Sequence, residues 1–175
     1  MTICESDPRQ RFLEGMSRTA CTVAVVTTDG PFGRQGVTVS AMSSVSADAP
    51  KPTLLVCVHH LSRAASAILG NGVFCVNVLS EDQSHISDGF AGRVPLPGGD
   101  KFACAEWTSE VTGAPRVVDP LVAFDCRLVS SQQVGTHHVL IGSVEHVFTA
   151  DRGSPLLYAQ RAYASLARPA ELRAV

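Results

Sequence analysis

This sequence lacks the features that mark membrane, secreted and nucleic-acid-binding proteins. Its longest uncharged run, residues 64–80, is interrupted by Gly70-Asn71-Gly72, so it is too short and too broken to cross a membrane. The N-terminal region has no apolar signal segment, and we therefore expect no signal peptide and a cytoplasmic location. The net charge of −2 offers no basic surface, which argues against nucleic acid as a partner.

The common nucleotide-binding and hydrolase motifs are absent as well. Gly30, Gly33 and Gly36 do not form a G-x-G-x-x-G fingerprint, and no strand–helix–strand unit surrounds them. There is also no phosphate-binding P-loop, no H-E-x-x-H and no G-x-S-x-G. A protein with this sequence would have to bind a nicotinamide without a dedicated dinucleotide fold.

Cysteine is plentiful, but its pattern does not predict a cysteine-based site. The six cysteines are 17 to 36 residues apart, and no two of them form a C-x-x-C pair. Several lie in apolar, strand-like runs, so we expect free and largely buried thiols in a reducing compartment, with no disulfide and no metal site. The six are Cys4, Cys21, Cys57, Cys75, Cys104 and Cys126.

The composition is that of an ordinary globular protein, with 45% hydrophobic and 17% charged residues. A chain of 175 residues fits one domain, and no linker, repeat or low-complexity segment divides it. We expect a single domain over residues 1–175, with residues 1–10 and 168–175 as tails.

Hydrophobic periodicity predicts about seven short strands with helices added. Helices are expected at residues 8–16, 63–69 and 80–90, the last one started by a capping box of Ser80 and Gln83. Most strands are neighbours in the chain, which favours an antiparallel barrel. The predicted strands are 23–28, 36–41, 53–58 (buried on both faces), 73–79, 121–129, 138–149 and 156–158; residues 92–100 form a loop, 130–136 a hairpin or bulged turn, and an alanine-rich helical tail follows the last strand.

The segment 36–52 has the character of a binding surface. Side chains alternate along a strand, so the apolar residues at 37, 39 and 41 are expected on one face and the residues at 38, 40 and 42 on the other. The serine-rich stretch that follows leaves backbone groups and hydroxyls open to a flat heterocycle or a phosphate. A polar edge strand that runs into a loop is the alternative. The candidate contacts are Thr38, Val39, Ser40, Ala41, Met42, Ser44 and Val45.

Two further places carry polar side chains suited to a ligand. Ser62 and Arg63 stand where a strand meets a helix, and the free N–H groups of the helix start together with the guanidinium favour an anion. An ordinary helix cap with a solvated arginine is the alternative. His137 lies in a tight turn beside His138, where it is either a solvated residue or a ligand contact, and no further ligand accompanies the pair at metal-site spacing.

Taken together, the pieces resemble a known enzyme family. Their order and spacing are similar to those of the short-chain NAD(P)H:flavin reductases, the reductase components of two-component flavin monooxygenases such as 4-hydroxyphenylacetate 3-monooxygenase. The resemblance runs from about Phe12 to Leu166. It implies a mainly β fold with appended helices, the antiparallel Greek-key split barrel that binds FMN, and a homodimer. The pieces are residues 36–41, 44–46, 57–62, 74–79, 99–102, 135–137, 141–142 and 155–158.

The resemblance also implies roles for the candidate residues. In the family the segment matching Thr38–Met42 lies along the isoalloxazine edge, and the segment matching Ser62–Arg63 approaches the flavin phosphate. From its place after the loop, Phe102 either covers an aromatic ring, as a cofactor contact, or staples its loop to the barrel. His137 matches the histidine of a Gly-Asp-His pattern that lies close to the nicotinamide, although Thr136 replaces the aspartate. The remaining candidates, Arg161 and Tyr163 with Tyr158, either serve the nicotinamide or pack the C-terminal region.

The implied activity is hydride transfer from NADH or NADPH to FMN or FAD, with the reduced flavin passed to a partner monooxygenase. In this step the flavin carries the chemistry, while the protein stacks and aligns the two rings. Two alternatives remain open at this point: flavin-dependent reduction of a bound cobalt corrinoid, and a flavin-binding or redox-sensing module without turnover. The sequence leaves open the choice between the two flavins and between the two nicotinamides.

Overall fold

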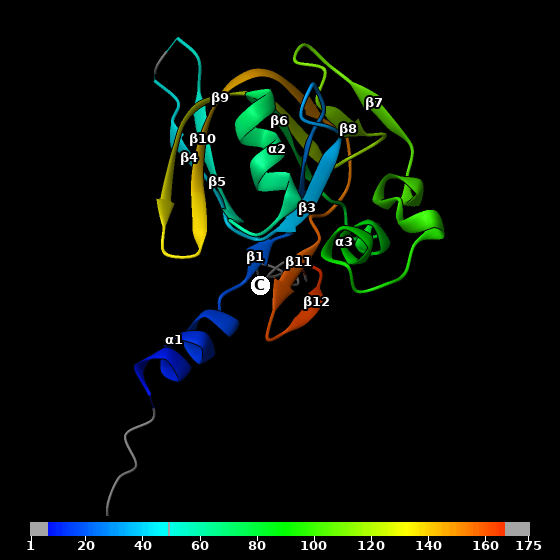
Figure 1. The fold of residues 1–175 in the computed structure, drawn as a ribbon. Coiled ribbons are helices and arrows are strands. Elements are labelled where there is room, and N and C mark those ends of the chain that lie inside the picture. Colours follow the sequence, from blue (N-terminus) through cyan, green and yellow to red (C-terminus); the bar gives the residue numbers. More distant parts are fainter. Residues whose placement is uncertain (1–6, 49, 167–175) are drawn as a thin grey trace, which may run out of the picture.

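The computed structural model describes residues 7–48 and 50–166. The fold is mainly β with helices added, as the sequence predicted (Figure 1). Its helices are α1 (Pro8–Ser17), α2 (Arg63–Asn71) and α3 (Ser84–Ala91), with 3-10 turns η1 (Pro97–Gly99) and η2 (Lys101–Cys104). Its strands are β1 (Cys21–Thr22), β2 (Ala24–Thr28), β3 (Gln35–Val39), β4 (Met42–Ser46), β5 (Thr53–His59), β6 (Val73–Val78), β7 (Trp107–Ser109), β8 (Pro115–Val117), β9 (Val122–Val134), β10 (His137–Thr149), β11 (Leu157–Ala159) and β12 (Ala162–Ala164).

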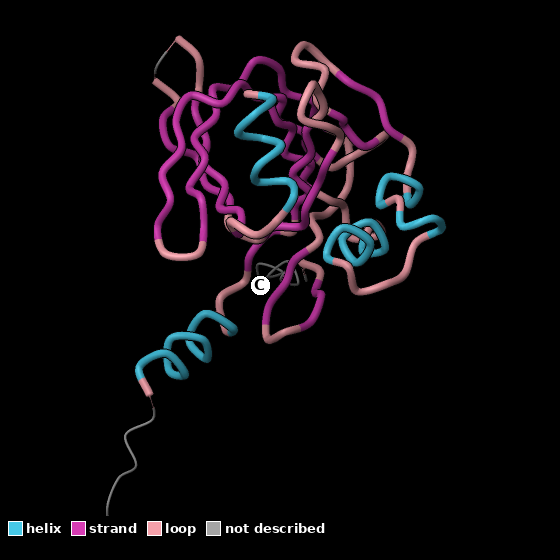
Figure 2. Tube along the Cα trace, in the orientation of Figure 1, coloured by secondary structure: helices cyan, strands magenta, loops and turns pink. Residues whose placement is uncertain are grey.

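Seven strands form one antiparallel sheet in the order β3-β2-β6-β9-β10-β5-β4. The edge strands β3 and β4 follow each other in the chain, separated only by Ser40 and Ala41. Because two residues span so little distance, the sheet must curl until its two edges lie near one another. Figure 2 shows the strands curving around α2. Since β3 and β4 are not paired by hydrogen bonds, the barrel is split.

Side chains from β2, β5, β6 and β10 fill the barrel together with one face of α2. Phe74 lies at its centre, fully buried. Its ring leaves no room for a side chain at Gly142, where a Cβ would stand 2.4 Å from Phe74 Cζ. A second cluster outside the barrel joins α3 and η2 to β8 and contains Phe90 and Phe102. This second cluster fixes η2 beside the barrel.

The helix α2 begins and ends where its sequence predicts. Ser62 caps it, because Ser62 Oγ accepts a hydrogen bond from the Ala64 N–H at 3.3 Å. It ends at Gly72, whose φ of 70° is left-handed and favours glycine. Between these ends Ala65 and Ile68 point into the barrel. None of the helices among residues 7–48 and 50–166 is long and apolar enough to cross a membrane.

The predicted continuous strand 36–41 is wrong, because the chain breaks it between β3 and β4. Val39 ends β3 and Met42 begins β4, so the alternation of faces is reset between them. Val37, Val39 and Met42 therefore pack against the same core cluster, although the alternation placed Met42 on the opposite face. The break allows the chain to pass from one edge of the sheet to the other.

The prediction that residues 53–58 are buried on both faces is also wrong. In β5, Leu54, Val56 and Val58 are buried, whereas the residues between them are only half-buried. An antiparallel sheet packs one face on its core, and the other face can remain partly open. The prediction for residues 73–79 was better, since every residue of β6 is buried.

Three local predictions need smaller corrections. The α3 helix starts at Ser84 with Gln83 as its cap. Gln83 Oε1 accepts from the Ser80 N–H at 3.1 Å, but the Gln83 N–H donates to the Ser80 carbonyl at 2.9 Å and not to its hydroxyl, so only half of the capping box forms. The predicted hairpin connection 130–136 is mostly strand, and only Gly135 and Thr136 form the turn. The chain after β11 forms β12, not a helix, and the remainder of the predicted helical tail, residues 167–175, lies outside the described residues.

The five described cysteines, Cys21, Cys57, Cys75, Cys104 and Cys126, are free. Burial, together with nearby Asp125, raises the pKa of Cys75 well above its usual value and that of Cys126 to about 12. We expect both thiols to resist a thiol reagent at pH 8 in the folded protein, because the reactive thiolate is scarce. All six cysteines of the sequence are expected to react after denaturation without reductant. Counting thiols before and after denaturation tests this, and a pair missing from the denatured count would show a disulfide.

Candidate functional site

The candidate site is a cavity of about 430 Å³ at the start of α2. Three segments meet there: the start of β3, the first turn of α2, and the turns η1 and η2. It brings together Ser62, Arg63 and Phe102, which the sequence had nominated separately. The lining residues are Arg34, Gln35, Gly36, Ser62, Arg63, Ala64, Gly99, Asp100, Lys101 and Phe102.

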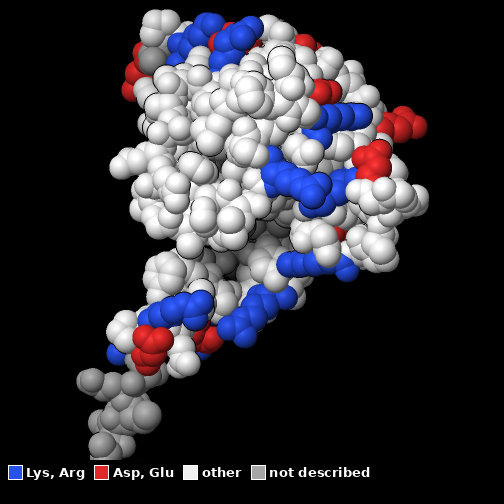
Figure 3. Space-filling view, in the orientation of Figure 1, with Lys and Arg blue, Asp and Glu red and all other residues white. Residues whose placement is uncertain are grey.

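The cavity carries an excess of positive charge. Arg34, Arg63 and Lys101 line it, and Asp100 is its one carboxylate. Asp100 Oδ1 already accepts a hydrogen bond from the Phe102 N–H at 2.9 Å. Within residues 7–48 and 50–166, neither Arg34 nor Arg63 forms an ion pair. Figure 3 shows basic side chains gathered between α2 and α3. Unpaired guanidinium groups beside a helix start suit a phosphate.

Phe102 forms the aromatic wall of this cavity. Its ring is 8% exposed and meets Phe90 and Trp107 edge to face, with centroids 5.1 and 4.9 Å away. Trp107 Nε1 donates to the Phe102 carbonyl at 2.8 Å. The guanidinium of Arg34 lies 4.0 Å from the ring centroid, within cation–π range. Phe102 therefore staples η2 to the protein and also holds Arg34 at the cavity.

The start of β3 approaches α3 too closely for a side chain at Gly36. A Cβ there would stand 2.4 Å from Phe90 Cε1. Farther along β3, Thr38 Oγ1 donates to the Ser87 carbonyl of α3 at 2.7 Å. These two contacts hold the cavity-lining end of β3 against the helix.

The remaining candidates of the segment 38–45 continue from that strand but do not line the cavity. Val39 is buried in the core and Met42 packs against it, so their side chains are structural. Ser40, Ala41, Ser44 and Val45 are exposed along the split between β3 and β4. The Ala41 carbonyl already accepts a hydrogen bond from the Cys57 N–H at 3.1 Å.

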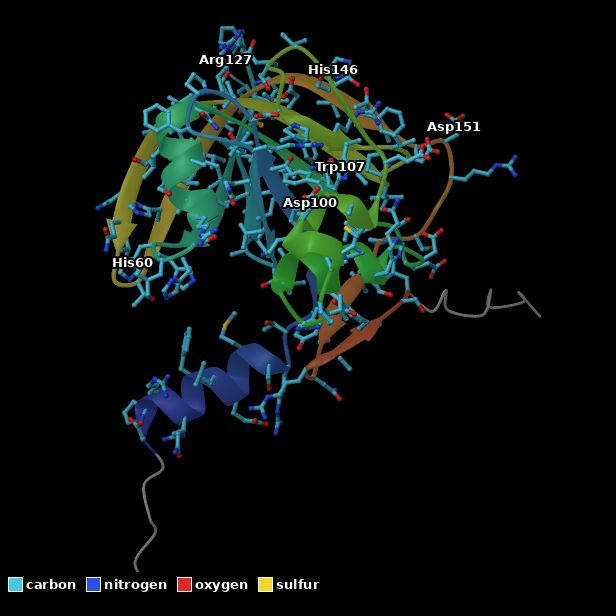
Figure 4. The ribbon with its side chains drawn as sticks, turned by 45° about the vertical axis from the view of Figure 1, so that its right-hand side comes forward. His60, Asp100, Trp107, Arg127, His146 and Asp151 are labelled. Carbon is cyan, nitrogen blue, oxygen red and sulfur yellow. The ribbon has the colours of Figure 1, made fainter. Side chains whose placement is uncertain are left out.

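His137 begins β10 at the tip of the β9–β10 hairpin and is exposed. It does not line the cavity. Its strand partner is His59, and their ring centroids are 5.0 Å apart. Figure 4 shows His60 beside this hairpin tip and well separated from Asp100. The loop from His59 to Ser62 nevertheless connects the hairpin tip to the start of α2.

Arg161 and Tyr163 lie elsewhere. Arg161 occupies the turn between β11 and β12 with φ of 63°, and its guanidinium is 3.9 Å from Glu14 of α1. The Tyr163 hydroxyl donates to Asp88 Oδ1 at 2.7 Å and contacts Ser87 Oγ at 2.9 Å. Burial raises the pKa of Tyr163 above its usual value. Tyr163 thus packs β12 onto α3.

Sequence reasoning missed three cationic residues. Arg34 and Lys101 line the cavity, and Arg93 takes the place foreseen for Arg161, since its guanidinium bonds to the hydroxyls of both Tyr158 and Tyr163. No motif marks Arg34 or Arg93, and Lys101 lies in the 99–102 piece of the resemblance without having been assigned a role. Within the described part of the chain, no group of three or more histidine, cysteine or acidic side chains is placed to hold a metal ion.

Comparison with known proteins shows the family of this chain. The model of the flavin reductase like domain matches residues 16–167. The chain belongs to the flavin reductase-like family. It is 46% identical over 157 residues to a protein of Methylorubrum extorquens named FMN reductase (NADH) RutF 1, a match that covers 90% of this chain and 76% of the relative.

Solved structures agree with this assignment. The flavin reductase PheA2 has a TM-score of 0.81 and 30% identity, covering 93% of this chain and 100% of the other. The styrene monooxygenase flavin reductase of Pseudomonas putida has a TM-score of 0.79 and 26% identity, covering 91% and 99%. The predicted family and split-barrel fold are therefore confirmed. The protein is an NAD(P)H:flavin oxidoreductase, which removes the alternative of a module without turnover.

Proposed function

We propose that this flavin reductase uses NADH to reduce FMN and supplies the reduced flavin to a partner monooxygenase. The observation that carries the proposal is the cationic cavity at the start of α2, which suits the phosphate of FMN. The name of the Methylorubrum relative supports FMN and NADH, and the name of the styrene monooxygenase reductase supports a monooxygenase partner. No feature of the cavity favours a corrinoid.

The residues present fit a flavin phosphate. Arg34 and Arg63 offer charged donors, and the start of α2 adds the positive end of the helix dipole. A bound flavin supplies the redox chemistry, because its ring accepts the hydride from the nicotinamide. The protein's own residues would bind and orient the flavin: the cavity would hold the phosphate, and the exposed residues Ser40, Ala41, Ser44 and Val45 along the split of the barrel would border the ring.

The direct test is anaerobic turnover with each flavin and each nicotinamide in turn. We expect NADH to bleach the absorbance of FMN, with a lower efficiency for FAD and for NADPH. Riboflavin, which lacks the phosphate, should bind more weakly than FMN if the cavity takes that group. Failure of NADH to bleach FMN without air would refute the proposed activity.

We also propose a homodimer, which the exposed apolar surface supports. The helix α1 buries none of its residues, and Phe12, Leu13 and Met16 are 65%, 47% and 50% exposed. Figure 1 shows α1 projecting away from the barrel. A second copy would cover such residues. Light scattering that gives a monomer mass at working concentration would exclude the dimer.

We propose that His137 aligns the nicotinamide and performs no proton transfer. His137→Ala is then expected to leave FMN affinity intact and to lower the efficiency of NADH use by about 2- to 12-fold, the value of one hydrogen bond. The rate of anaerobic bleaching against NADH concentration measures this loss.

The matched control is His138→Ala, since His138 is half-buried and its side chain points to the opposite face of β10. An equal loss in both variants would remove the assignment of His137. A loss of more than about 100-fold would indicate proton transfer, which is worth about 10²–10⁴.

A further inference from the structure

His59 meets His137 across two strands. It ends β5, His137 begins β10, and the two residues are partners in the antiparallel ladder. Their ring centroids are 5.0 Å apart and their planes are inclined by 80°, an edge-to-face contact. Such a contact favours one mutual orientation of two aromatic rings over others. The ring of His137 is thus packed on one side although the residue is exposed.

His59 is itself held in place by its own loop. The Leu61 N–H donates to His59 Nδ1 at 3.2 Å. The Ser62 N–H donates to the His59 carbonyl at 2.9 Å, which closes the turn. The His60 N–H donates to the Thr136 carbonyl at 2.9 Å and ties the same turn to the hairpin tip. His59 is exposed, but the Leu61 N–H and the His60 ring, whose centroid is 5.0 Å away, restrain its ring.

His137 has little else to orient it. The hydrogen bond of its ring within the described residues joins Nδ1 to Thr136 Oγ1, 3.1 Å away. A threonine hydroxyl can donate or accept and rotates to suit, so it does not select one state of the imidazole as a carboxylate would. The contact with His59 is the second restraint on this ring.

We propose that His59 is a positioning residue for His137, replacing by ring packing the orientation that an acidic neighbour would give. The proposal rests on the proposed function, because it assigns His59 to the alignment of the nicotinamide through His137. His59 does not touch the substrate in this scheme. His59 holds the rotamer of His137, the ring that contacts the nicotinamide. The nicotinamide then meets an imidazole that is already oriented.

Two variants separate the ring of His59 from its hydrogen bond to the loop. His59→Asn removes the ring but keeps a side-chain acceptor for the Leu61 N–H, as asparagine does in turns. His59→Phe keeps a ring beside His137 and loses that acceptor. We expect His59→Asn to lower the efficiency of NADH use by about 2- to 5-fold and His59→Phe to stay near the parent, with FMN affinity unchanged in both.

A double-variant cycle tests whether His59 affects the use of NADH through His137. In a His137→Ala background, His59→Asn should change the efficiency by less than about 1.5-fold, because the ring it positions is gone. Leu61→Ala is the control, since Leu61 lies in the same loop, is 78% exposed and keeps the backbone N–H that donates to His59. His60 is unsuitable, because its ring centroid is 5.0 Å from that of His59. Equal losses from His59→Asn in both backgrounds, or a weakened FMN affinity, would show that His59 only supports the loop, and would overturn the proposal.

NMR of the full chain tests the positioning apart from turnover. The ring protons of His137, identified by their absence in His137→Ala, should shift in His59→Asn because the neighbouring ring current is lost, and should stay unchanged in Leu61→Ala. Unshifted protons in His59→Asn would refute the contact. If NADH fails to bleach FMN while these protons shift as expected, the proposed function fails and the positioning contact stands.

Discussion

Arg63→Ala is expected to weaken FMN binding by roughly 10- to 150-fold, because a hydrogen bond to a charged group is worth about 1.5–3 kcal/mol. Arg63 begins α2, lines the cavity and forms no ion pair within residues 7–48 and 50–166. The free energy of unfolding should scarcely change, since the side chain is exposed. Titration of flavin fluorescence measures the two dissociation constants.

Two controls make the result specific to the phosphate. Riboflavin lacks this group, so its affinity should be nearly the same in Arg63→Ala and in the parent. Arg127→Ala removes an exposed arginine of β9 that does not line the cavity, and Figure 4 shows Arg127 well separated from Asp100. FMN affinity should be unchanged in this variant. Equal FMN dissociation constants for Arg63→Ala and the parent would remove the start of α2 from the flavin site.

Phe74→Ala is expected to lower the free energy of unfolding by about 3–5 kcal/mol, the usual cost of a phenylalanine deleted from a core. Phe74 is fully buried at the centre of the barrel, where its ring occupies the space left by Gly142. The surrounding strands belong to one hydrogen-bonded sheet and cannot easily collapse into the gap. Chemical denaturation followed by circular dichroism measures the change.

Phe12→Ala provides the same chemical change at a side chain that is 65% exposed on α1. Its free energy of unfolding should differ from the parent by less than about 0.5 kcal/mol. A loss below about 1 kcal/mol in Phe74→Ala would mean that the centre of the barrel repacks around the missing ring, contrary to the close packing of cores.

Local signals in the sequence were sufficient for several elements. Asp7, Ser62 and Gly72 mark helix ends through hydrogen bonds or backbone angles that involve only near neighbours, and the structure places caps at all three. The apolar run of β6, interrupted only by Asn77, also predicted its burial. The family resemblance then supplied the split barrel, which the comparisons confirm.

Elements that depend on distant contacts were predicted less well. Alternation along residues 36–41 cannot reveal the break at Ser40 and Ala41, because the break serves to join two edges of a closed sheet. The outer face of β5 is half-buried because other segments cover it only in part, and the sequence of β5 does not contain this information. Only half of the capping box at Ser80 forms, because the Gln83 N–H donates to the Ser80 carbonyl and not to its hydroxyl.

The candidate site shows the same division. The sequence by itself determined that Ser62 caps a helix and that Arg63 follows it, since both depend on a few consecutive residues. Only the tertiary structure decided that Arg34 and Lys101 join them, that Arg93 and not Arg161 meets the tyrosines, and that His59 packs against His137. The reason is physical: a helix start forms from local hydrogen bonds, whereas a cavity or a cross-strand pair exists only after the sheet has brought remote segments together.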